Sequence, residues 1–134
     1  MRYKKINIMT ALCFIILIQS CGSKSPTPTP PAEQPITFSH NAGNNVLNPG
    51  PSLSFNVTLT SAMPSGGIKV EISTKEEASG NVVGTNSSTS GTSAAVTASI
   101  SSLPRQLWCV VTIKVTSQRT ASNSATQTFR IVYK

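Results

Sequence analysis

Apolar and polar residues alternate along most of the chain after residue 36. The longest run, residues 107–117, has an apolar side chain or a cysteine at every odd position up to 115, with Lys114 and Thr116 among its even positions. In an extended strand successive side chains point to opposite faces, so a period of two predicts strands with one buried face. The alternating runs predict seven strands, at residues 36–39, 52–60, 67–73, 81–85, 93–101, 107–117 and 125–133.

Short turn-forming sequences separate these runs. Proline, glycine, asparagine and serine gather at residues 48–51, 64–67, 79–81 and 90–92, where they favour turns. No stretch after residue 36 keeps the spacing of an amphipathic helix. Seven short strands in about 100 residues therefore predict an all-β fold, a single antiparallel β-sandwich.

The number and spacing of these strands over residues 36–134 resemble those of Ig-like domains, the fibronectin type III kind included. The resemblance implies two packed sheets of about seven strands in total. Two Ig hallmarks are placed differently in this sequence. Cys109 lies in the sixth predicted strand with no cysteine in the second, and Trp108 lies in the sixth strand rather than the third.

The first 20 residues follow another pattern. Residues 1–5 are basic, residues 6–18 are mostly apolar, and the small residue Ser20 precedes Cys21. This order is typical of a secretory signal peptide, and the apolar run is shorter than the about 20 residues that span a bilayer. The sequence Ile-Gln-Ser-Cys at residues 18–21 resembles the lipobox of bacterial lipoproteins. The resemblance implies cleavage before Cys21, lipidation of Cys21 and attachment to a membrane through that lipid.

Residues 21–35 are the predicted tether between the lipid and the domain. Five prolines between residues 26 and 35 exclude helix and sheet and favour polyproline II, which would hold the domain roughly 30 Å from the bilayer. Gly22 follows the lipidated cysteine, and no acidic cluster follows it. By analogy with lipoproteins that are sorted by these positions, we expect the outer membrane of a bacterial envelope, with a periplasm-facing orientation favoured over the cell surface.

The composition offers little for catalysis or for metal binding. The 134 residues contain no aspartate, one histidine (His40) and four acidic residues. No triad, acid–base pair or metal-ligand cluster can be assembled from these, so we expect no enzyme activity, no cofactor and no metal ion. The formal net charge is +7, but the basic residues are scattered rather than gathered in a patch, so we expect no nucleic-acid partner.

Trp108 is the candidate ligand contact. Its phase in the strand places it opposite Cys109, on the outer face with Val110, Thr112 and Lys114. An exposed tryptophan can stack on a sugar ring or anchor a protein partner. The alternative is that Trp108 covers one end of the core. Cys109, by the same phase, is expected inside the sandwich as a small apolar residue.

The sequence also predicts where two other polar groups lie in the fold. His40 and the asparagines at positions 41, 44 and 45 are expected to form a solvated loop. The sequence Lys-Glu-Glu at residues 75–77 is expected at the tip of a hairpin over residues 73–81.

Taken with the signal peptide, the domain predicts a lipid-anchored envelope protein with a non-catalytic Ig-like binding or structural module. The expected partner is an unknown envelope protein, contacted through an edge strand, and the alternative is a glycan bound by Trp108. A small hydrolase is the remote alternative.

Overall fold

A computed structural model describes residues 31–134 of the chain. These residues form eight strands, and among them there is no helix that could cross a membrane. The strands are β1 (Phe38–His40), β2 (Asn45–Asn48), β3 (Leu53–Leu59), β4 (Ile68–Glu76), β5 (Ser87–Gly91), β6 (Ala95–Ile100), β7 (Trp108–Ser117) and β8 (Ser124–Tyr133). The predicted signal peptide, Cys21 and most of the predicted tether lie outside the described residues.

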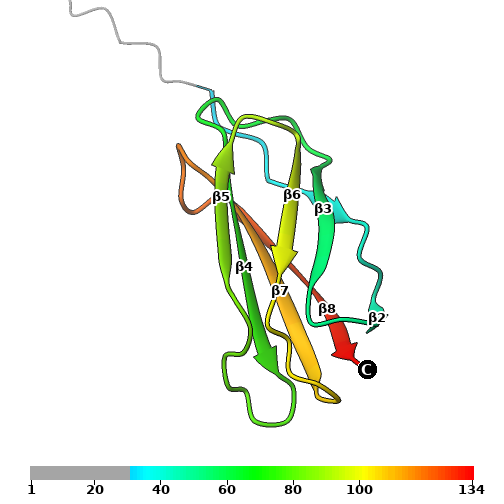
Figure 1. Ribbon diagram of the computed structural model, residues 1–134. Coiled ribbons are helices and arrows are strands. Elements are labelled where there is room, and N and C mark those ends of the chain that lie inside the picture. The colour runs from blue at the N-terminus through cyan, green and yellow to red at the C-terminus, as the bar shows by residue number, and fades with distance from the viewer. Residues whose placement is uncertain (1–30) are drawn as a thin grey trace, which may run out of the picture. The chain divides into compact units, whose positions relative to one another are not determined.

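The strands form two sheets (Figure 1), one in the order β1-β3-β6 and one in the order β2-β8-β7-β4-β5. All pairs are antiparallel except β2 and β8, which run parallel. In the Ig scheme, strands A, B and E form one sheet and strands G, F, C and C′ the other. The observed orders follow this scheme, with the first strand divided between β1 and β2. The prediction of an all-β, Ig-like sandwich is confirmed.

The core lies between the sheets and uses the alternating positions that the sequence pattern selected. The inward residues of β7, from Cys109 to Val115, have at most 1% of their surface exposed, and the residues between them are half-buried or exposed. Phe55 of β3 meets Phe129 of β8 edge-on, with ring centroids 5.3 Å apart. Burial of this apolar surface, at about 25 cal/mol per Å², is the main force that holds the sheets together.

The strand predicted at residues 81–85 is wrong. Only Val82 in this segment forms an isolated bridge, to Lys75, and the strand that pairs with β4 is β5, further along the chain. Gly84 has a φ of +70° and approaches Ser101 so closely that a Cβ there would lie 2.7 Å from its carbonyl oxygen. The chain therefore bends at residue 84. β5 was missed because its sequence, Ser-Ser-Thr-Ser-Gly, has no apolar alternation.

β2 and the position of His40 also differ from the prediction. β2, with the sequence Asn-Val-Leu-Asn, pairs with the last strand at the edge of the five-stranded sheet. His40 is the final residue of β1 rather than part of a solvated loop, and its ring lies 5.3 Å from that of Phe129. The four-residue strand β2 is too short for periodicity to detect, because it contains at most two repeats of the alternation.

Candidate functional site

The outer face of the five-stranded sheet carries a row of three apolar side chains at one end. Trp108 of β7 is paired with Val132 of β8, and Val132 is paired with Leu47 of β2. Paired residues share a face of the sheet, so the three side chains lie side by side. Leu47 is 59% exposed and Trp108 is half-buried, whereas Val132 is only 5% exposed because its two neighbours flank it.

Trp108 therefore lies on the face where its phase in the strand predicted it, opposite the buried Cys109. It is not among the half-buried apolar residues that pack against the core. The alternative, in which Trp108 covers the end of the core, is not what the structure shows. Whether Trp108 contacts a ligand stays a prediction.

Arg130 orients the indole ring. The guanidinium carbon of Arg130 lies 4.6 Å from the centroid of the Trp108 ring, within the range of a cation–π contact. The same guanidinium donates from Nη2 to Oε2 of Glu77, at 2.6 Å. Both charged side chains are about two-fifths exposed, so the pair contributes little to stability. Its effect is to restrict the rotation of Arg130 and, through it, of Trp108.

An open hollow of about 420 Å³ borders the indole ring. Its lining residues come from three strands and from the ends of the chain segments beside them: Leu47, Gln106, Trp108, Val132 and Lys134. The Gln106 backbone has a φ of +62° and its N–H donates to the Tyr133 carbonyl at 2.7 Å, which ties this loop to β8. These five residues together with Arg130 are named the Trp108 surface.

A second hollow, of about 460 Å³, lies over β4, β5 and β7 and is lined mostly by residues of polar type. Its lining includes Glu71, Ser73, Asn86, Thr112 and Lys114. Lys69 donates to Oε1 of Glu71 at 2.7 Å, and this hydrogen bond holds the pKa of the Glu71 carboxyl below its ordinary value.

The described chain begins at the turn between β7 and β8, where the Asn123 side chain holds it. Asn123 accepts from the N–H of Ile36 at 3.0 Å and donates to the carbonyl of Gln34 at 2.9 Å and to Oε2 of Glu33 at 3.3 Å. The Ser117 hydroxyl and then Asn123 itself lower the pKa of Glu33. The last residues of the predicted tether are therefore fixed to this turn.

The candidate catalytic side chains are placed in or beside the core. Cys109 is buried, its thiol is within 3.7 Å of the Leu107 carbonyl, and burial raises its pKa, so the thiol stays protonated. The His40 ring lies against that of Phe129. Neither Cys109 nor His40 lines either of the two hollows. Within residues 31–134 no three His, Cys or Glu side chains come together as a metal site. Cys21 lies outside the described residues, so its lipidation stays a prediction.

The edge strands bear on the predicted mode of contact. β5 is at one edge of the five-stranded sheet, is largely exposed, and has none of the charged or proline residues that block edge pairing. β2 is at the other edge, beside the Trp108 surface. Contact through an edge strand stays a prediction.

Comparison with solved structures shows a likeness in fold. No protein-family model matches the sequence, and no curated protein matches it. The sensor domain of the anti-sigma factor RsgI4 of Pseudobacteroides cellulosolvens superimposes with a TM-score of 0.45 at 20% identity, over 77% of this chain and 100% of that one. At this degree of similarity no ligand or activity is transferred from that domain to this chain.

Sequence reasoning found Trp108 but missed the residues that surround it. Arg130 was not among the candidate residues, because only the register of β7 against β8 brings it close to Trp108. The sequence pattern did not identify Leu47 as a site residue, because it lies in an asparagine-rich segment without alternation. Leu47 reaches the site through the parallel pairing of β2 with β8.

Proposed function

We propose that the protein is a lipid-anchored, non-catalytic binding module of the bacterial envelope, and that the Trp108 surface contacts a partner protein. The observation that carries the proposal is the row of Leu47, Val132 and Trp108 on a sheet face that is otherwise largely polar. Soluble domains seldom expose grouped large apolar side chains on one side of a sheet unless another molecule covers them.

The composition of this surface favours a protein partner. Tryptophan and arginine are the residues most enriched among those that dominate binding energy at protein interfaces. Trp108 is held by Arg130, so little side-chain entropy is lost when a partner covers it. The hollow beside the ring has a volume of about 420 Å³, enough for one large side chain, and Gln106 and Lys134 give it a polar rim.

A glycan is the second candidate, and one observation favours it. The second hollow, with its serine, threonine and asparagine side chains, lies on the same outer sheet face as Trp108. Hydroxyl and amide groups beside an aromatic ring suit sugar recognition. Arg130 already covers the indole ring, however, which leaves less of the ring for stacking.

Site-specific photo-crosslinking tests the protein contact. Leu47 is replaced by p-benzoylphenylalanine in cells that produce the protein, and the envelope is irradiated. We expect a discrete adduct with a second polypeptide. The matched control carries the same group in place of Ser54, which is exposed on the other sheet, and should give none. An adduct of equal yield at both positions, or at neither, contradicts the proposed surface.

Separate experiments test the glycan and the anchor. A glycan array probed with the wild type and with Trp108→Ala should show no Trp108-dependent binding if the partner is a protein. Radiolabelled palmitate should enter the wild type and not the Cys21→Ala variant. Equal labelling of both proteins would remove the lipid anchor from the proposal.

A further inference from the structure

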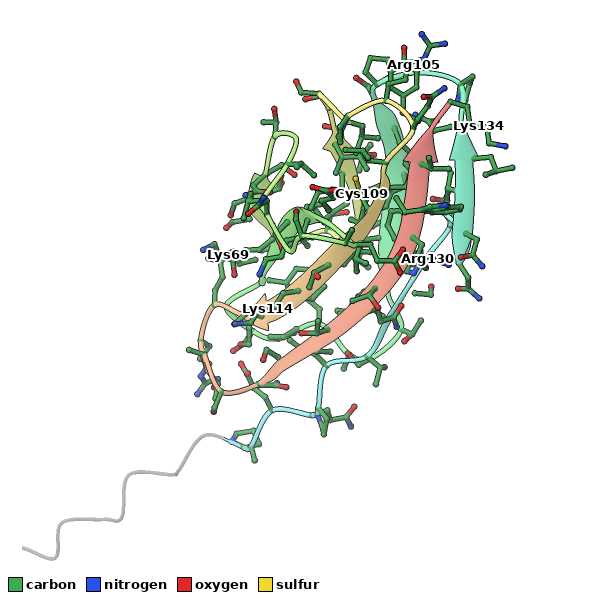
Figure 2. All side chains as sticks on the ribbon, turned by 90° about the horizontal axis from the view of Figure 1, so that it is seen from below. Lys69, Arg105, Cys109, Lys114, Arg130 and Lys134 are labelled. Carbon is green, nitrogen blue, oxygen red and sulfur yellow. The ribbon has the colours of Figure 1, made fainter. Side chains whose placement is uncertain are left out.

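The chain enters the domain at the end remote from the Trp108 surface. Trp108 is the first residue of β7 and Ser117 is the last. Ten residues of strand, at about 3.3 Å each, separate these ends by roughly 30 Å. Asn123, which holds the start of the described chain, pairs its carbonyl with the N–H of Ser117. Figures 1 and 2 agree that residue 31 and the end of β8 lie at opposite ends of the domain.

The end of the domain that carries the Trp108 surface has an excess of positive charge. Arg105 forms an isolated bridge with Tyr133 and so lies beside Lys134, and both labels appear together at one end of the domain in Figure 2. Lys75 is paired with Val110, which in turn is paired with Arg130.

Two acidic residues, Glu76 and Glu77, lie at the same end of the domain. Glu77 is paired with Arg130, and Glu76 accepts from the Ser79 hydroxyl at 2.6 Å. The two ion pairs of residues 31–134 are Lys69–Glu71 and Arg130–Glu77, so Arg105 and Lys134 have no carboxylate partner in this part of the chain. Lys134 lines the hollow, and Arg105 directly precedes Gln106, which also lines it. These two cations are thus open to a carboxylate from outside.

We infer that the Trp108 surface binds an acidic segment of another polypeptide. An apolar side chain of that segment fills the hollow between Leu47 and Trp108, and flanking carboxylates meet Arg105 and Lys134. The inference rests on the proposed function and adds the chemistry of the partner. Guanidinium and ammonium groups on the rim of an apolar hollow select acidic over basic sequences, because like charges placed there repel.

Trp108 is the one tryptophan of the chain, so its fluorescence reports on this surface directly. The full-length chain, in non-ionic detergent, is titrated with the octapeptide Glu-Glu-Phe-Glu-Glu-Leu-Glu-Glu and with the same peptide in which every Glu is Lys. We expect a saturable blue shift of the emission with the acidic peptide alone. The apparent affinity should fall about tenfold or more when salt rises from about 50 mM to about 500 mM, because exposed charges are screened.

Two double variants separate this site from general charge attraction. Arg105→Gln with Lys134→Gln should weaken binding of the acidic peptide by about fivefold or more. Lys69→Gln with Lys114→Gln removes the same charge from the other end of the same sheet, as Figure 2 shows, and should change the affinity by less than about twofold.

Three results would overturn the inference. They are an equal response to both peptides, an equal loss in both double variants, and no spectral change up to about 1 mM peptide. Polygalacturonate is titrated in parallel, and a saturable response to it with none to the acidic peptide would assign the surface to an anionic glycan instead. Crosslinking at Leu47 without an acidic-peptide response would leave the proposed surface standing and refute only the charge of its partner.

Discussion

The Asn123→Ala substitution tests whether one side chain fixes the start of the domain to the β7–β8 turn. It removes three hydrogen bonds, to the N–H of Ile36, the carbonyl of Gln34 and the carboxylate of Glu33. Of the last two groups, the Gln34 carbonyl is exposed and is hydrated in the variant, whereas the Glu33 carboxylate is partly buried. The Ile36 N–H belongs to a buried residue, which has 5% of its surface exposed, and loses its acceptor.

The expected cost follows from that asymmetry. A buried donor left without a partner costs about 1–3 kcal/mol, and a hydrogen bond exchanged for water costs about 0.5 kcal/mol or less. We therefore expect the free energy of unfolding to fall by about 2 kcal/mol. For a domain of about 100 residues this lowers the Tm by roughly 8–16 °C.

Urea unfolding followed by the Trp108 fluorescence measures the free energy, and amide hydrogen exchange measures the local effect. The Ile36 amide should be protected in the wild type and exchange quickly in the variant. Asn45→Ala, on the exposed side of β2, is the matched control and should cost less than about 0.5 kcal/mol. Unchanged protection of the Ile36 amide in Asn123→Ala would refute the reasoning, even if the overall stability fell.

Three further outcomes are expected. Gly67→Ala should lower the free energy of unfolding, measured by thermal unfolding, by about 2–3 kcal/mol, because φ is +83° and a Cβ would lie 2.6 Å from a carbonyl oxygen. Gly43 has a similar φ of +80° but lies in open space, so Gly43→Ala should lower it by only about 1 kcal/mol. Cys109 should resist a thiol reagent at pH 8 until urea unfolds the protein, because it is buried and its pKa is raised; rapid labelling of the folded protein would contradict its placement. Lys69→Gln should raise the pKa of Glu71 toward its ordinary value in an NMR titration, since Lys69 lowers it. The stabilising contribution of ionised Glu71 is present above the ordinary carboxyl pKa and is lost as the pH falls through its folded-state pKa. An unchanged Glu71 titration in the variant would show that Lys69 does not lower this pKa.

The strands that the sequence predicted correctly are those with one face in the core. In β3 and β7, and over residues 68–72 of β4 and 129–133 of β8, an apolar side chain or a cysteine recurs at every second residue. Each of these four strands was predicted within a few residues of its bounds. β5 escaped prediction because it is an edge strand with little buried surface, so selection for burial leaves no period in its sequence. β2 escaped because its pairing with β8 joins segments that are more than 80 residues apart.

The fold class, the inward direction of Cys109 and the outward direction of Trp108 could all be predicted without the structure. These depend on the period of a single strand, which is local information. The tertiary structure alone decided that Arg130, Leu47 and Val132 meet Trp108, and that the chain enters at the far end of β7. Register and sheet order depend on which distant strands pair. The free energy of that pairing comes from contacts over the whole core, so no single segment of the sequence predicts it.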